Sequence, residues 1–210
     1  LAENNKENID KLTEKAVQSA SSTDEDSELI AKVVSVASDE IANKVVEEVS
    51  KTSTDEKQDL SAKVLKAIVD TEPSKIETLD EEIKEKVIEQ TIDAAKNQQE
   101  NLTEGQTLSI DEDLTNVVAD IVTKADNNTA AKVLETLNEA SEETESKLTL
   151  NVVENLTKKE NYEEKIEILS VTSTVVDNSI SKMMEKAVEQ ADTENDIEKV
   201  KNIVENSKGT

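Results

Sequence analysis

The chain has 210 residues, and its 49 acidic side chains outnumber its 24 lysines, which gives a formal net charge of −25 at pH 7. A surface this acidic repels phosphate groups, so we expect no binding of nucleic acids and no attraction to anionic membranes. No apolar run approaches the roughly 20 residues that cross a bilayer, so membrane insertion is not expected.

Apolar residues make up 34% of the chain and are nearly all Val, Ile, Leu and Ala, with one Tyr and no Phe or Trp. Aromatic rings normally fill the thick centre of a globular core. Their scarcity favours a thin arrangement of two helical layers that small aliphatic side chains can close. High charge with low hydrophobicity is also typical of disordered chains, but the apolar residues here are periodic, which indicates an ordered chain.

Three amphipathic helices are predicted at the start of the chain. The first lies within residues 1–20, and the next two carry their apolar residues over 30–37 and 42–49. Ser38 is the expected N-cap of the third helix. The second and third helices follow each other so closely that they form either a tightly turned pair or one longer bent helix.

A fourth helix over 60–68 ends before Pro73, the only proline, because the residue before a proline avoids helical geometry. The Ser-x-x-Glu sequence at 74–77 has the spacing of a capping box, which predicts the longest helix from there to about Asn97. The following segment, 98–110, is rich in Gln, Asn and Thr and contains the one interior glycine. It is the best candidate for a linker or break.

The second half is more regular, because its apolar positions fall at alternating intervals of 16 and 19 residues. These positions are Val117, Val133, Val152, Ile168, Ala187 and Ile203. The intervals add to a period of 35 residues, and a shift by this period aligns apolar residues and turn residues in columns. The columns are Val118, Val153 and Val188, then Leu134, Leu169 and Val204, and the turn residues Asp126, Asn161 and Asp196.

Each 35-residue period holds two short helices joined by a turn, which is an αα-hairpin. Stacked hairpins predict an all-α chain, an α-solenoid of antiparallel helical hairpins with about eleven helices. We expect irregular repeats in 1–97, a break in 98–110 and regular repeats in 111–210, within one continuous solenoid. Capping residues are expected in the second half at Ser109, Asn161 and Thr193.

The run from Ala125 to Leu137 contains the pattern Asp-x-x-x-Ala-Ala-x-Val-Leu-Glu-x-Leu. This run resembles the superhelical N-terminal domain of MgtE-type magnesium transporters, and similar short acidic αα-repeats occur in flagellar motor switch proteins. Residues 39–49 echo the same pattern. The resemblance implies a superhelix of helical hairpins. It implies no transport activity, because no membrane region accompanies it.

Few side chains suited to catalysis are present. The chain has no His, Cys or Arg, which removes the usual proton shuttle, the thiolate nucleophile and the arginine clamp. Carboxylate pairs can perform acid and base chemistry, but with 49 acids nearly every helix face carries such pairs as solvated surface. We therefore expect no enzyme activity, no catalytic residues and no cofactor.

Divalent cations are the more serious alternative, because hard cations take oxygen ligands. Carboxylates cluster at expected helix starts in 24–26, 80–82 and 111–113. None of these has the loop glycine and distal glutamate of an EF-hand, and acids in a first helical turn already interact favourably with the helix dipole. We predict diffuse cation binding and no specific metal site. The weak candidates for such a site are Asp24, Asp26, Asp111 and Asp113.

Three further side chains are chemically distinctive. Tyr162 is expected at a turn, and Met183 and Met184 occupy apolar positions of a helix. Thioether side chains commonly fill irregular gaps in a core. Packing in the core is therefore the role expected of both methionines.

Composition and repeat together predict a structural or interaction protein, which acts as a spacer, a scaffold or a head-to-tail polymerising subunit at the cell surface or outside the cell. A solenoid exposes an unfinished apolar face at each end unless it is capped, so self-association or binding of another protein is expected. The chain begins with Leu rather than Met, and we expect a processed product or a fragment. The alternative is an intracellular regulatory module that binds a partner helix or divalent cations.

Overall fold

The computed structural model describes residues 2–21, 23–53, 57, 59–102, 106, 108–109, 112–142, 147–172 and 174–207. Within these ranges the chain forms twelve helices and no strand, which confirms the all-α prediction. The count exceeds the expected eleven because one predicted helix is divided into two.

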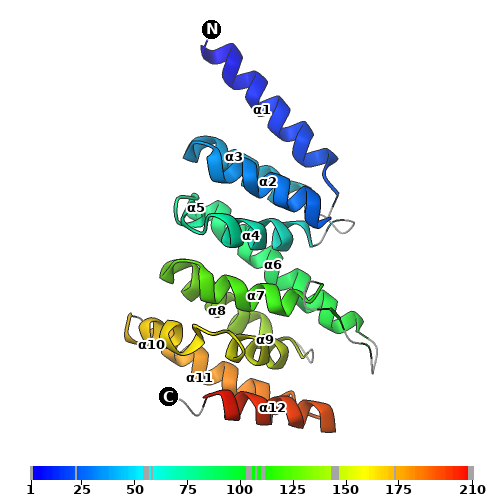
Figure 1. Cartoon of the computed structure of the whole chain (residues 1–210), viewed down its shortest axis with the longest axis vertical. Coiled ribbons are helices and arrows are strands. Elements are labelled where there is room, and N and C mark those ends of the chain that lie inside the picture. Colours follow the sequence, from blue (N-terminus) through cyan, green and yellow to red (C-terminus); the bar gives the residue numbers. More distant parts are fainter. Residues whose placement is uncertain are drawn as a thin grey trace. The chain divides into compact units, whose positions relative to one another are not determined.

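The chain divides into two compact units, Leu1–Thr91 and Ile92–Thr210, and the boundary falls inside one helix, α6. The helices before that boundary are α1 (Ala2–Ser19), α2 (Asp24–Val36), α3 (Asp39–Thr52), α4 (Leu60–Thr71), α5 (Ser74–Glu77) and the start of α6 (Glu81–Asn101) (Figure 1). The helices after it are α7 (Leu114–Lys124), α8 (Asn127–Glu142), α9 (Leu148–Thr157), α10 (Tyr162–Thr172), α11 (Thr174–Glu189) and α12 (Glu194–Asn206).

Hydrogen-bonding side chains fix where several helices begin. The Thr193 side chain accepts a hydrogen bond from the Asp196 backbone, and the Asp196 carboxylate accepts one in return, which confirms the predicted cap at Thr193 as a full capping box on α12. Ser38 stands at the N-cap position of α3, although its side chain makes no capping hydrogen bond. The close pair of helices is therefore two tightly turned helices, α2 and α3.

Of the other two predicted caps, the one at Ser109 is wrong and the one at Asn161 also makes a tertiary contact. The N-cap of α7 is Asp113, whose carboxylate accepts a hydrogen bond from the Thr115 backbone N–H at 2.9 Å, whereas Ser109 donates to Glu112 before the helix begins. The Asn161 side-chain amide donates to the carbonyl of Thr123 at 2.9 Å and so joins two helices of unit 2. Asn161 stands directly before α10, and its carbonyl accepts a hydrogen bond from the Lys165 backbone N–H at 3.0 Å, so it lies at the predicted cap position.

The longest predicted helix is also wrong in its boundaries. Pro73 is the N-cap of the short helix α5, and Ser74 donates to the Glu72 carboxylate at 2.6 Å instead of capping. The chain then turns, because the Asp80 backbone N–H donates to the Asn43 side chain at 2.7 Å and Leu79 is buried. The next helix, α6, begins after this turn and continues to Asn101, into the segment predicted as a linker.

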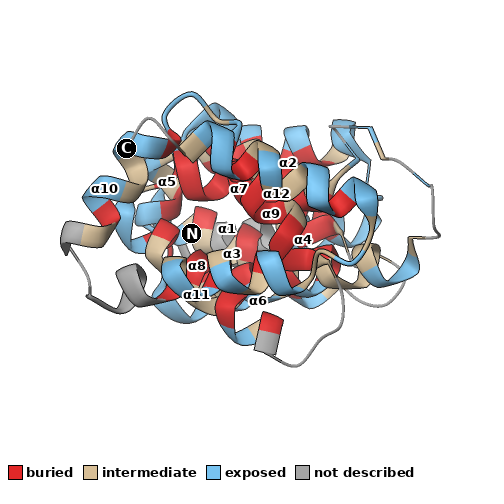
Figure 2. Cartoon of the chain, turned by 90° about the horizontal axis from the view of Figure 1, so that it is seen from below, coloured by how far each residue is buried: buried red, intermediate tan, exposed pale blue. Residues whose placement is uncertain are grey.

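Within each unit, several helices lie against two later helices in the chain. In unit 2, α7 packs against α8 and α9, α8 against α9 and α11, and α9 against α11 and α12. In unit 1, α2 packs in the same way against α3 and α4, and α1 packs against α3. Buried residues lie on the faces that these neighbours turn toward each other (Figure 2). They are mostly Val, Ile, Leu and Ala, as expected for thin layers.

The predicted 35-residue columns hold only in part. Of the six anchor positions, Ile168 is 39% exposed and the others are buried. In the neighbouring columns, Val188 and Val204 are 58% and 49% exposed. The columns fail because α11 and α12 both pack against α9, whereas α10, which the period places as the partner of α9, packs mainly against α11.

A longer repeat relates the two units. Residues 88 positions apart correspond, as Ala31 corresponds to Ala119. Identical residues recur at this shift from α2 to α4 and from α7 to α9. They are Ala31, Val34, Ala37, Ala42, Lys44, Val45, Glu47, Ser53, Leu60 and Val64, which match Ala119, Val122, Ala125, Ala130, Lys132, Val133, Glu135, Ser141, Leu148 and Val152. The two units are therefore built on one helical pattern.

Polar contacts repeat with the same shift. The Ser53 and Ser61 hydroxyls form a hydrogen bond at 2.8 Å in unit 1, and the Ser141 and Thr149 hydroxyls form the corresponding bond in unit 2. These hydroxyl pairs join the end of α3 to α4 and α8 to α9. Glutamine side chains add contacts nearby without following this shift, because Gln90 of α6 accepts from the Ser61 hydroxyl at 2.7 Å and Gln190, just after α11, accepts from the Leu150 backbone N–H at 3.0 Å.

Lysines cap the C-terminal ends of earlier helices in both units. The Lys75 amine donates to the carbonyl of Ala37, after α2, at 2.9 Å, and the Lys165 amine donates to the carbonyl of Ala125, after α7, at 2.6 Å. Both lysines open the sequence Lys-Ile-Glu-x-Leu. A positive charge at this end stabilises the helix dipole and satisfies a carbonyl that the helix leaves without a partner.

Two valines on α2, one buried and one exposed, test which face of this helix packs in the core. Val34 is 0% exposed and Val36 is 85% exposed. We expect Val34→Ala to lower the free energy of unfolding by about 2 kcal/mol, because it removes two buried methyl groups and leaves a cavity. Val36→Ala is the matched control and should change it by less than about 0.5 kcal/mol. Urea denaturation followed by circular dichroism measures both, and equal losses would contradict this orientation of α2.

Candidate interaction surface

Exposed apolar side chains gather on four helices. Eight large apolar residues of the described chain are exposed, and seven of them lie on α1, α2, α11 and α12. These seven are Leu12, Leu29, Val33, Val36, Val188, Ile197 and Val204, and the eighth is Ile168 on α10. Single exposed apolar residues are ordinary, but a concentration on particular helices marks a surface that is suited to contact.

The residues on α1 and α2 border an apolar groove of about 460 Å³. Leu12 of α1 and Leu29 and Val33 of α2 form its exposed rim. Its base is buried and includes Val17 of α1 and Val45 of α3. The groove lies entirely within unit 1, and it has the apolar lining that accepts the face of an amphipathic helix.

This groove exists because α2 carries two apolar stripes. One stripe includes Ile30 and Val34, which are buried where α2 packs against its neighbours. The second stripe is Leu29, Val33 and Val36, at the i, i+4 and i+7 positions of one helix face. The first stripe belongs to the core of unit 1, and Leu29 and Val33 of the second stripe lie at the exposed rim of the groove.

In unit 2, α12 carries a matching row. Ile197 and Val204 are seven residues apart, so they lie on one face of the helix, and they are 61% and 49% exposed. Ile203 and Asp196 are buried where α12 packs against α9. Packing against α9 and the exposed row thus use different faces of α12.

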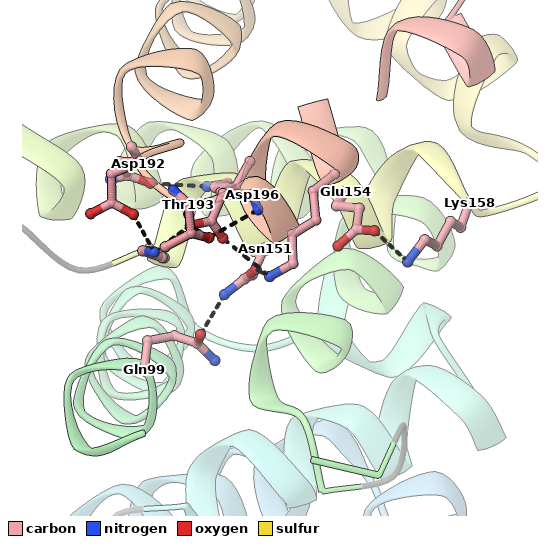
Figure 3. A network of polar contacts seen from close by, with 11 residues as sticks. Gln99, Asn151, Glu154, Lys158, Asp192, Thr193 and Asp196 are labelled. Atoms are coloured by element: carbon pink, nitrogen blue, oxygen red, sulfur yellow. Dashed lines mark hydrogen bonds and ion pairs between the residues drawn. The ribbon is translucent and has the colours of Figure 1, made fainter. Parts of the chain in front are cut away.

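A polar network holds α12 in place (Figure 3). The Lys147 amine, just before α9, donates to Asp192 at 2.5 Å and also to Asp196. On the other side, the Lys199 amine donates to Asn151 of α9 at 2.5 Å. The Asn151 amide in turn donates at 2.5 Å to Gln99 of α6. The chain of contacts runs from α12 through α9 to α6, all within unit 2.

The charges in this network support each other. Burial raises the pKa of Asp196, but hydrogen bonds from Lys147 and Thr193 outweigh burial, so the pKa of this carboxyl lies below its ordinary value. Burial likewise lowers the pKa of Lys147, and hydrogen bonds to Asp192 and Asp196 outweigh it, so the pKa of this amine is raised. Both groups therefore stay charged near neutral pH and act as a buried anchor for α12 rather than as an acid–base pair.

The predicted cation candidates do not come together as a metal site. Asp24 is exposed and lies 3.7 Å from Lys63, and Asp26 accepts two hydrogen bonds from Ser21. Asp113 caps α7 and also accepts a hydrogen bond from Asn155 at 3.1 Å. Asp111 lies outside the described residues. Within the part of the chain that the structure describes, no group of three or more carboxylates is arranged to hold a metal ion.

The three distinctive side chains have different environments. Met183 is 2% exposed, which confirms its place in the core, whereas Met184 is only half-buried. Tyr162 begins α10 and is 5% exposed, and burial raises the pKa of its hydroxyl. None of the three lies in the α1–α2 groove.

The apolar groove was not predicted as a set of residues. The sequence did contain a signal for it, because Leu29, Val33 and Val36 form one stripe of α2, but the predicted apolar face over 30–37 included Val33 and left out Leu29. In a single sequence such a stripe is easily taken for a wider core face. Only the packing of α2 against α3 and α4 separates the two.

Comparison of the chain with family models, with characterised proteins and with solved structures gives no match. The resemblance of residues 125–137 to the MgtE-type repeats therefore stays a prediction. Among the described residues, no helix has both the length and the apolar character needed to cross a membrane.

The Asp196 anchor predicts a pH dependence of the stability of unit 2. Because its pKa is lower in the folded chain than the ordinary value of 3.8, Asp196 stabilises the fold above about pH 4. That contribution is lost as the pH falls through the folded-state pKa. At pH 7 we expect Asp196→Asn to cost about 2 kcal/mol, the usual size for a hydrogen bond to a charged group.

Asp192 provides the matched control, because it contacts the same lysine but is 71% exposed. Asp192→Asn should cost less than about 1 kcal/mol, as is typical of surface ion pairs. Thermal unfolding of both variants between pH 3 and pH 7 measures the difference. If the Asp196→Asn variant keeps the full acid dependence of the unaltered protein, another carboxylate is responsible.

Proposed function

We propose that this chain is a structural interaction protein, an α-solenoid segment that serves as a spacer or scaffold and joins other proteins through its first and last helices. The single observation that carries the proposal is the position of the exposed apolar residues. Seven of the eight in the described chain lie on α1, α2, α11 and α12. Contact through these helices, rather than chemistry in a cleft, is the activity that such a distribution favours.

The polar contacts support a spacer role. Side chains from later helices bind the ends of earlier ones, as Lys75 binds the carbonyl after α2 and Lys165 the carbonyl after α7. Such bonds fix how far one helix is shifted along another, because each lysine amine meets its carbonyl at only one relative position along the helix axes. A scaffold needs this stiffness, since a flexible chain would not keep its binding surfaces at a set separation.

A second candidate is a regulatory module that binds a partner helix, and the α1–α2 groove is the observation that favours it. The two candidates use the same surface and differ in what fills it. The cation-binding form of this alternative has less support, because Asp26 and Asp113 already accept capping and tertiary hydrogen bonds.

Electron–electron distance measurements test the spacer role, and the absence of cysteine makes site-specific spin labels straightforward. Labels at Glu28→Cys on α2 and Glu198→Cys on α12 report the separation between the two units. A reference pair, Glu163→Cys and Glu198→Cys, lies within unit 2. We expect the first pair to give a distance distribution as narrow as the second in protein diluted with unlabelled chain. A broad distribution for the first pair alone would rule out a stiff spacer.

A further inference from the structure

The order in which the helices pack indicates what kind of element would fill the α1–α2 groove. In unit 2, α9 lies against α11 and α12, and α7 lies against α8 and α9, so each of these helices packs against two later helices. By the same order, a helix that covers the junction of α1 and α2 would lie in the groove between them. The groove is thus shaped for a helix of the kind that the chain itself contains.

The 88-residue repeat shows that the exposed positions are of a kind that is normally covered. Leu29 and Val33 correspond to Val117 and Ile121 in α7. The α7 residues are 1% and 0% exposed, whereas Leu29 and Val33 are 60% and 48% exposed. An equivalent pair is therefore fully buried in the second copy of the pattern. In the first copy, burial of this pair requires a partner.

The last two helices present the complementary surface. Ile197 and Val204 form the outward row of α12, and Val188 is exposed on the preceding helix, α11. The charges also complement each other. Exposed Lys11 and Lys15 flank Leu12 on α1, and exposed Glu185 and Glu189 flank Val188 on α11 at the mirrored spacings of one and three residues.

We propose that the α1–α2 groove binds α12 of a second copy of this chain, with Ile197 and Val204 entering the groove and α11 of that copy lying against α1. This inference rests on the proposed scaffold function and names the partner of its surface. The contact continues the packing order within each unit, because α12 would cover α1 and α2 as α9 covers α11 and α12.

The two surfaces are different, so the contact is heterologous. One copy uses its groove and the other uses its α12, which leaves a free groove and a free α12 on every pair. Such contacts build open chains, or rings where the rotation closes. Association should therefore continue beyond the dimer, in contrast to a groove-to-groove contact, which stops at two copies.

Sedimentation of the full chain at about 0.15 M salt, over a wide range of concentrations, provides the test. We expect the unaltered protein to form species larger than dimers. Leu29→Lys blocks the groove and Ile197→Lys blocks the α12 row, and each should weaken association at least tenfold, because a charge replaces an apolar contact. Both residues are about 60% exposed, so these variants should keep the helical content of the unaltered protein. Leu29→Gln separates lost apolar contact from added charge.

Mixing the two blocked variants gives the decisive result. The Leu29→Lys variant keeps an intact α12 row, and the Ile197→Lys variant keeps an intact groove, so an equimolar mixture should form a one-to-one dimer and nothing larger. Ile168→Lys is the matched control, because it puts the same charge on an exposed apolar residue outside both surfaces, and it should associate like the unaltered protein.

Three outcomes would overturn the proposal. These are a monomeric unaltered protein at every concentration, a mixture of blocked variants that forms no dimer, and association that Ile197→Lys leaves intact while Leu29→Lys abolishes it. The last result would indicate that something other than α12 fills the groove. The spacer role is judged separately, by the distance distribution in diluted protein, so either idea can fail without the other.

Discussion

The structure depends on burial of small aliphatic side chains between successive helices. With one Tyr and no Phe or Trp in the chain, no single helix pair can enclose a thick core. Each helix must instead divide its apolar surface between two neighbours, as α9 does between α11 and α12. On α2, Leu29 and Val33 lie on a face that α3 and α4 do not cover, so these two side chains stay exposed.

The helical class followed from apolar periodicity, because a 3.6-residue stripe is a local property that one sequence displays directly. The order in which the helices pack did not follow from the sequence, because it depends on which helices contact one another in the folded chain. The helix α10 stands where the 35-residue period places it, but α9 packs mainly against α11 and α12. The pattern shared by residues 39–49 and 127–137 was visible as an echo, but its 88-residue shift gains meaning only when Ser53 and Ser141 make equivalent hydrogen bonds.

The sequence predicted that an exposed apolar surface exists, but it did not predict which residues form it. Stacked helices imply an unfinished apolar face, yet the sequence alone does not say which stripe of α2 is core. The roles of individual carboxylates were harder still to predict, because Asp196 was expected at a turn and instead anchors α12 through Lys147. Its role depends on Lys147, which is 49 residues away in the chain and is brought near by the packing of α9 against α12.

The net charge of the chain affects how readily two copies associate through such a surface. The seven apolar side chains on the four contact helices are already partly covered, so each contributes about 1 kcal/mol when fully buried. Their sum is comparable to the roughly 4–15 kcal/mol that association costs in lost freedom. A net charge of −25 adds repulsion between copies, which salt screens over about 8 Å at physiological strength. Salt therefore weakens repulsion between charges farther apart than this, whereas in the proposed contact the lysines of α1 and the glutamates of α11 would lie closer together, so salt should favour the specific contact over general repulsion.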